Sequence, residues 1–332
     1  QIQAVSQRLY QRVVKPVREL VGNTRHLLIS PDGGLNLVPF AALQDETGKY
    51  LVEQYSLTFL TSGRDLLRLK VKIPSQDPAV VVADPTYGDG TGPVLLGKGI
   101  GRLRQLDGTK AEGSFLKRLF PKAQVWMENQ ATKDRLKAVS KPALVHIATH
   151  GFFLEDAPKE PLNGTDFQRG ITLGDTPPPV NVEQLREANP LLRSCLFFAG
   201  ANGTANSTGE SGTMTALEAT GLDLWGTKLV VLSACDTGLG EVKNGDGVYG
   251  LRRALVLAGS EAQMMSLWPV SDEGTKELMQ QYYTRLKAGE GRSEALRQVQ
   301  LQMLKSKRWN HPFYWASFIQ SGEWANLNGK RK

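Results

Sequence analysis

Residues 228–240 read KLVVLSACDTGLG, and this stretch decides the fold class. An apolar run without polar alternation predicts a strand of a parallel sheet that is covered on both faces. The strand ends at Cys235, and a turn rich in small residues follows it. In open parallel sheets, reacting groups gather outside the carboxyl ends of the strands. The stretch therefore predicts an α/β protein with a cysteine at a position suited to chemistry.

Strand and helix signals alternate from residue 79 to about residue 320. This alternation predicts a mostly parallel central sheet with helices on both faces. A surface loop is expected over residues 155–181, and a mobile segment over residues 200–213. The expected strands cover residues 80–83, 123–126, 143–149, 192–199, 228–234 and 263–267, and the expected helices cover residues 110–120, 132–140, 246–258, 273–288 and 293–306.

The first 77 residues are expected to form a helix and a β-rich part, followed by the main domain over residues 78–325 and a basic tail over residues 326–332. Residues 1–21 predict one helix whose apolar stripe packs on the core or on an upstream segment. Residues 35–43 are expected to form a strand. Because the chain opens in a helix without a Met, we expect a longer parent protein. The stripe consists of Ile2, Val5, Leu9, Val13, Val17 and Leu20.

Composition places the chain among globular proteins. Of its 332 residues, 40% are hydrophobic and 22% are charged, and no apolar run is long enough to span a bilayer. The formal net charge of +7 is spread along the chain and does not gather on one element with aromatic residues. Neither a nucleic-acid partner nor a membrane is therefore expected. Two cysteines are too few for a disulfide framework, which predicts a reducing, cytoplasmic compartment.

A second predicted strand, residues 143–149, ends at His150. An imidazole beside a thiol favours the thiolate and can protonate a leaving amine, so His150 and Cys235 fit a nucleophile with its base. The backbone N–H groups of Gly151 and Cys235 would then bind an oxyanion. The alternative is a buried structural cysteine and a histidine that only ends a strand. Spacing alone does not choose between the two interpretations.

No metal and no cofactor are expected. His146 and His150 are four residues apart on a strand, a step of about 13 Å, which is too long for two ligands of one zinc ion. Residues 97–101 contain three glycines but lack the Lys and Ser/Thr of a phosphate-binding loop. Cys195 lies in an apolar predicted strand, where it is expected to fill the core. Three Asn-x-Ser/Thr sequons, at Asn163, Asn202 and Asn206, are interpreted as chance occurrences.

Five segments, in order, resemble the successive motifs of the CHAT family. They are residues 145–153 (VHIATHGFF), 229–240 (LVVLSACDTGLG), 245–248 with 251–259, 266–272 (SLWPVSD) and 311–316 (HPFYWA). Residues 27–43 (LLISPDGGLNLVPFAAL) also resemble the start of that domain, so that the resemblance covers about residues 24–324. Members of the family are caspase-like cysteine peptidases of clan CD, related to separase and often attached to tetratricopeptide repeats.

The resemblance implies a caspase-like α/β/α sandwich in which His150 and Cys235 form the catalytic dyad and Gly151 helps to bind the oxyanion. It implies a cysteine endopeptidase that cuts a dedicated protein substrate through a thioester, without a cofactor. In separase-like members, the acid that ends a Leu-Trp-x-Val-x-Asp segment lines the pocket for a basic side chain. Asp272 occupies that position, which predicts cleavage after Arg and, less strongly, after Lys.

Several alternatives stay open. Asp272 would also suit the N-cap of the helix that begins near residue 273. Asp236 and Asp223 are weaker candidates for substrate binding, or merely solvated acids. A different class of function is a non-catalytic protein-interaction module, in which the helix of residues 1–21 binds a regulatory partner. His150 and Cys235 discriminate between these classes, because a scaffold needs neither side chain at a strand end.

Overall fold

The structure is a computed structural model that describes residues 2–95, 98–153, 189–203, 212–235, 246–268 and 271–331. For residues 98, 153, 190, 234, 235 and 246–249 it describes the backbone alone. The predicted surface loop of residues 155–181 lies outside the described residues, as does most of the segment 200–213.

One mixed sheet organises the described chain, with its strands in the order β1-β2-β12-β11-β10-β7-β3-β6. Neighbouring strands along this path are parallel except β11 and β12, which are antiparallel. The mostly parallel central sheet that the sequence predicts is thus confirmed. The strands are β1 (His26–Ile29), β2 (Ser56–Phe59), β12 (Phe318–Gly322), β11 (Ala262–Ser266), β10 (Leu229–Cys235), β7 (Leu144–Phe153), β3 (Val80–Pro85) and β6 (Gln124–Glu128).

The last residues of β7 leave the parallel sheet. They pair antiparallel with β8 (Ser194–Phe197), and β8 pairs with β9 (Thr213–Thr215). The short strands β4 (Val94–Leu95) and β5 (Lys98–Gly99) form a separate hairpin. The ribbon of β8 and β9 therefore lies beyond the carboxyl edge of the parallel sheet, next to the end of β7.

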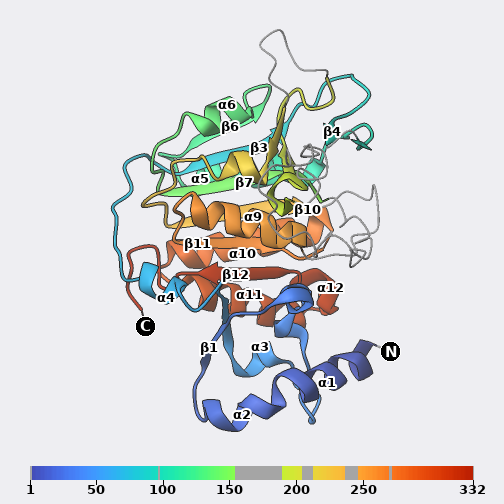
Figure 1. Ribbon diagram of the computed structural model, residues 1–332, viewed down its shortest axis with the longest axis vertical. Coiled ribbons are helices and arrows are strands. Elements are labelled where there is room, and N and C mark those ends of the chain that lie inside the picture. The colour runs from blue at the N-terminus through green and yellow to red at the C-terminus, as the bar shows by residue number, and fades with distance from the viewer. Residues whose placement is uncertain are drawn as a thin grey trace, which may run out of the picture.

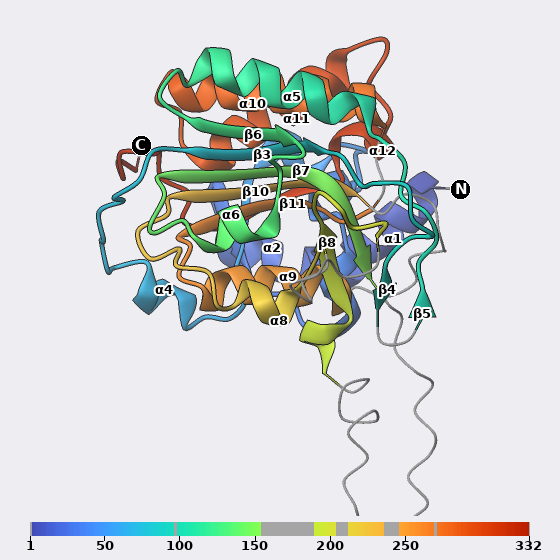
Figure 2. The same ribbon diagram turned by 90° about the horizontal axis from the view of Figure 1, so that it is seen from above.

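Helices cover both faces of the sheet, as Figure 2 shows edge-on. On one face lie α5 (Asp107–Leu119), α10 (Asp272–Lys287) and α11 (Arg292–Lys305), and on the other lie α8 (Ala216–Ala219) and α9 (Asp246–Leu257). The result is an α/β/α sandwich. The shorter helices are α3 (Leu51–Gln54), α4 (Asp65–Arg68), α6 (Lys133–Lys137) and α12 (Pro312–Trp315), with 3₁₀ turns at Gly33–Leu37, Phe40–Ala42 and Pro190–Leu192.

The central strands are apolar on both faces because both faces are covered. In β3, Val80 and Val82 pack in the hydrophobic cluster on the α9 face, whereas Val81 and Ala83 pack in the cluster beneath α5 and α10. Successive side chains of a strand point to opposite faces, so an uninterrupted apolar run is what this position requires. The same physical reason explains the apolar run that begins at residue 229, in β10.

The N-terminal part does not stand apart, because β1 and β2 extend the same sheet (Figure 1). The single helix expected over residues 1–21 is wrong: α1 (Ile2–Val13) and α2 (Lys15–Val21) are separated at Val14. Pro16 explains the break, since its ring and missing N–H do not fit a helix interior.

The expected apolar stripe of the N-terminal segment is buried only in part. Tyr10 and Val14 are the buried residues, while Ile2 is 63% exposed and Val5 is 54% exposed. A partner for this exposed face remains a prediction. The strand expected over residues 35–43 is also wrong, because this segment forms two 3₁₀ turns around Pro39, which cannot donate to a sheet.

Helix α5 lies close to β3 because it presents Gly113 to the sheet. A Cβ atom added at Gly113 would lie 3.0 Å from the Cβ atom of Ala83. We predict that Gly113→Leu lowers the free energy of unfolding by about 1–3 kcal/mol, because the larger side chain pushes α5 away from the sheet. Urea denaturation measures the effect.

The matched control is Gly34→Leu, because no atom lies within 4 Å of a Cβ added at Gly34. This variant should change the stability by less than about 0.5 kcal/mol. Equal stability of Gly113→Leu and the wild type would show that α5 does not pack on β3 at this distance.

Candidate active site

The candidate site begins where β7 and β10 end side by side. In the parallel pairing of these strands, His150 and Cys235 are register partners. Neighbouring strands lie about 4.8 Å apart, so the backbone brings together the two positions that the sequence singled out. The apolar residues before them are buried in the sheet and fix both strand ends.

The imidazole of His150 is held by a backbone carbonyl group. Its Nε2 atom lies 2.6 Å from the carbonyl oxygen of Arg104. A carbonyl oxygen only accepts, so Nε2 carries the proton and donates it. Within the described chain the buried Nδ1 atom has no hydrogen-bond partner. This tautomer leaves a lone pair on Nδ1, which is the form of the ring that accepts a proton.

Burial lowers the pKa of His150, because desolvation disfavours the imidazolium ion. The hydrogen bond to the Arg104 carbonyl and the negative charge of Asp272 oppose this effect but do not cancel it. The ordinary pKa of histidine is about 6.5. His150 is therefore neutral at pH 7 in the absence of a neighbouring thiolate.

Tyr87 fixes the backbone of β7 at His150, and sequence reasoning missed it. The N–H of His150 donates to the Tyr87 hydroxyl at 3.3 Å, and this hydroxyl lies 2.9 Å from Oγ1 of Thr149. Thr149 in turn donates to the carbonyl oxygen of Phe197 in β8. Burial raises the pKa of Tyr87 to about 12, so the phenol keeps its proton. Its place just after a strand end was the one signal in the sequence.

The segment that presents the Arg104 carbonyl is anchored at two points. Gln105 donates from its side-chain amide to the carboxylate of Asp84, at the end of β3. The side chain of Asn202 accepts from the Leu103 N–H at 2.8 Å and donates to the Leu103 carbonyl at 2.9 Å. Asn202 is only 2% exposed. Asn202 is thus anchored by these hydrogen bonds, and the mobility expected for residues 200–213 stays a prediction.

Asp272 lies near His150 but does not cap its helix. Asp272 is the first residue of α10, and the N-cap is Ser271, whose hydroxyl accepts from the Gly274 N–H. The N-cap alternative for Asp272 is therefore wrong. A Cβ atom added at Gly108 in α5 would lie 3.1 Å from the Cβ atom of Asp272. The exposed carboxylate is close enough to raise the pKa of His150.

The sequence pattern of the CHAT domain matches residues 3–323. The chain belongs to the CHAT domain family. The match begins before residue 24, where the resemblance was expected to start, so the two N-terminal helices fall within the CHAT domain.

Two curated relatives cover almost the whole CHAT domain. Human tetratricopeptide repeat protein 28 is 26% identical over 324 residues, which is 93% of this chain and 12% of the human protein. The mouse protein of the same name is 27% identical over 332 residues, with the same coverage of 93% and 12%. The chain thus spans only a small part of the length of these relatives.

Two solved structures have similar coordinates. Saccharomyces cerevisiae separase, in its complex with securin, matches with a TM-score of 0.45 and 12% identity over 90% of this chain and 16% of the matched chain. The Arg-specific cysteine proteinase gingipain R matches with a TM-score of 0.47 and 11% identity over 98% of this chain and 67% of the matched chain. Both TM-scores are below 0.5, so no residue role is transferred from either protein.

The other predicted site residues of the CHAT domain have different outcomes. Gly151 is buried one residue beyond His150, and it pairs with Leu196 of β8. Asp236 lies outside the described residues. Asp223 accepts a hydrogen bond from the Ser140 hydroxyl, near the amino end of β10. The length of that strand, about 20 Å, separates Asp223 from His150, so its candidacy for substrate binding at this site is wrong.

Cys195 is 0% exposed in β8, and burial raises the pKa of its thiol. It fills the core, as the sequence predicts. Within the described residues, no group of three or more His, Cys, Asp and Glu side chains could hold a metal ion. No helix in the described part of the chain is long and apolar enough to cross a membrane.

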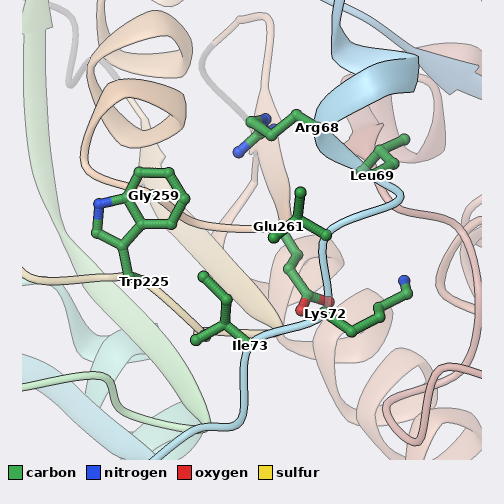
Figure 3. A pocket seen from close by; sticks show the side chains of 9 residues that line it. Arg68, Leu69, Lys72, Ile73, Trp225, Gly259 and Glu261 are labelled. Atoms are coloured by element: carbon green, nitrogen blue, oxygen red, sulfur yellow. The ribbon is translucent and has the colours of Figure 1, made fainter.

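Figure 3 shows side chains that line a hollow, among them Arg68, Ile73, Trp225 and Glu261. The hollow is small, with a volume of about 20 Å³. The hollow is lined by residues that precede β10 and β11, and so it lies at the amino ends of these strands. His150 lies at the carboxyl ends. The two features are at opposite edges of the sheet, and this hollow is not part of the candidate active site.

We predict that the imidazole of His150 titrates below about pH 6.5 in the Cys235→Ala variant, because burial lowers its pKa. The substitution removes the thiol, whose ionised form would raise the pKa of the ring. NMR titration of the histidine ring protons measures this value, and a second sample with His150→Gln assigns the signal. A titration above pH 7 would contradict the geometry of a desolvated ring.

Proposed function

We propose that this CHAT domain is a cysteine endopeptidase that cuts a dedicated cytoplasmic protein. The observation that carries the proposal is the register pairing of His150 with Cys235 at the carboxyl edge of the sheet. It is supported by the His150 tautomer, in which the Arg104 carbonyl engages Nε2 and Nδ1 keeps its lone pair. An interaction module would need neither the pairing nor the oriented ring.

In the proposed reaction, Nδ1 of His150 takes the proton of the Cys235 thiol, and the thiolate attacks the scissile carbonyl carbon. The lowered pKa of His150 keeps the ring neutral until this step, so that it is able to accept the proton. The backbone N–H groups of Gly151 and Cys235 donate to the oxyanion. His150 then protonates the leaving amine while the C–N bond breaks, and a thioester remains on Cys235.

Hydrolysis of the thioester uses the same groups. His150 takes a proton from water as the water oxygen adds to the thioester carbonyl, and the C–S bond then breaks to release the acid. The proton returns from His150 to the sulfur of Cys235. In both halves of the reaction the Arg104 carbonyl accepts from Nε2–H, which stabilises the transient imidazolium ion.

We further propose that Asp272 binds the side chain of Arg, or less strongly Lys, before the cleaved bond. Ser271 caps α10, so the carboxylate of Asp272 is not occupied by capping. Within the described chain this carboxylate enters no ion pair. Its charge reaches His150, as required of a group beside the reacting bond. A guanidinium fits a carboxylate through two parallel hydrogen bonds, which an ammonium cannot form.

Cys235→Ala and His150→Ala should each abolish the cleavage of proteins that the wild type cuts, because the nucleophile or its base is lost. A comparison of proteome digests by mass spectrometry, with each variant beside the wild type, measures this loss. The matched control is Cys195→Ala, which removes the other cysteine of the chain from a buried strand. This control should still cut.

A wild type that cuts nothing beyond the Cys235→Ala background would contradict the peptidase proposal. That result would favour the protein-interaction module, since binding to a partner would then persist in both variants.

Asp272→Asn should lower kcat/KM for cleavage after Arg by about 10- to 100-fold, since a charge-assisted contact is worth roughly 1.5–3 kcal/mol. Peptides with Arg or its uncharged analogue citrulline before the cleaved bond measure the preference. The matched control is Glu273→Gln, because Glu273 lies in the same helical turn and pairs with Arg308. Equal losses on both peptides, or in both variants, would contradict the proposal that Asp272 binds the basic side chain of the substrate.

A further inference from the structure

A cluster of buried polar side chains lies one layer beneath the dyad positions. We call it the Glu112 cluster, and it consists of Glu112 in α5, His146 in β7, Ser233 in β10 and Tyr283 in α10. These residues are 3%, 0%, 6% and 0% exposed, respectively. The proposed reaction uses none of them.

The contacts within the Glu112 cluster link all of its members. The Ser233 hydroxyl donates to Oε1 of Glu112 at 3.1 Å, and Nε2 of His146 lies 3.1 Å from Oε2 of the same carboxylate. This contact between His146 and Glu112 is not a hydrogen bond, since neither atom has a hydrogen-bond partner in the described chain. Nδ1 of His146 lies 2.9 Å from the Tyr283 hydroxyl. The carboxylate of Glu112 thus links α5 to β7 and β10, and His146 links β7 to α10.

Stability alone does not account for this arrangement. A buried carboxylate is costly unless it is paired, and apolar side chains of the same volume often stabilise a core equally well or better. Apolar neighbours surround the Glu112 cluster, among them Leu116, Ala148 and Val231. What a polar cluster adds is a single preferred alignment, because the contacts of Ser233 with Glu112 and of His146 with Tyr283 form in one register only.

Each element joined by the Glu112 cluster also carries a part of the candidate active site. His150 lies four residues after His146 in β7, and Cys235 lies two residues after Ser233 in β10. Helix α5 follows the segment that presents the Arg104 carbonyl to His150. Helix α10 begins with Asp272 and contacts α5 at Gly108.

We propose that the Glu112 cluster is a positioning device, which aligns β7, β10, α5 and α10 so that His150, Cys235 and the Arg104 carbonyl meet. The inference rests on the proposed peptidase function. Its members are positioning residues, because none of them touches the reacting atoms. A displacement of about 1 Å between reacting groups costs on the order of 100-fold in rate, so a small loss of alignment has a measurable effect.

The decisive variant is Tyr283→Phe, which removes one hydroxyl group and leaves Nδ1 of His146 without its partner. We expect kcat per folded molecule to fall about tenfold or more, while KM changes little because the substrate pocket is left intact. The rate of Cys235 alkylation by iodoacetamide should fall with kcat, because thiolate formation depends on a well-placed imidazole. Peptide mass mapping shows which cysteine carries the label. Cys195 is fully buried and should stay unlabelled.

The chain offers a matched control in the adjacent residue. Tyr282 is also 0% exposed, and its hydroxyl donates to Gln320 of β12 at 3.0 Å, away from β7 and β10. Tyr282→Phe should lower Tm about as much as Tyr283→Phe but leave kcat and the alkylation rate within about twofold of the wild type. If Tyr283→Phe does not fold, Ser233→Ala takes the place of that variant in the comparison, because it also removes a single hydroxyl from the Glu112 cluster.

The outcomes separate this inference from the proposed function. Wild-type kcat and alkylation rates in folded Tyr283→Phe or Ser233→Ala, or equal losses in Tyr282→Phe, would overturn the positioning role while the peptidase proposal stands. Slower alkylation in Tyr283→Phe alone, combined with a wild type that cuts nothing, would support the positioning role and overturn the peptidase proposal. Alkylation needs no substrate, so the alkylation rates test the positioning role whether or not the peptidase proposal holds.

Discussion

The parallel pairing of β7 with β10 is the constraint on which the rest of the site depends. It runs from Leu144 with Leu229 to His150 with Cys235. A slip by one residue would turn His150 to the opposite face of the sheet. The apolar pattern does little to prevent such a slip, because Leu144 packs in one hydrophobic cluster and Val145 in the other. Burial holds the strands together, but it does not choose their register.

Polar residues inside the sheet supply the missing preference. A slip of β7 would carry His146 into the apolar cluster on the α9 face, and it would remove the contacts of His146 with Oε2 of Glu112 and with the Tyr283 hydroxyl. Either change costs more than the small loss of apolar contact in the slipped register. The His146 contact with Glu112 and the Ser233 hydrogen bond with Glu112 therefore select one alignment of the two strands. His150 and Cys235 lie at the ends of the same two strands, so they are aligned with each other as well.

Sequence reasoning found the two strand ends at His150 and Cys235, but it did not find the Arg104 carbonyl group that orients His150. The apolar runs before His150 and Cys235 predict buried parallel strands, and the carboxyl ends of such strands meet at one edge. The Arg104 carbonyl has no sequence signal, because every residue has a carbonyl group and only the fold selects one. Two of the errors had a visible cause: Pro16 and Pro39 interrupt the predicted helix and strand.

Under the proposed specificity, Asp272 couples substrate binding to the proton chemistry of His150. Burial lowers the pKa of His150, and the charge of Asp272 partly restores it. Under the proposed specificity, an arginine side chain bound to Asp272 neutralises that charge, so the pKa of His150 falls further when the substrate binds. A weaker base gives a stronger conjugate acid. The imidazolium ion, which forms when His150 takes the proton of the Cys235 thiol, then protonates the leaving amine more readily when a basic side chain occupies the pocket.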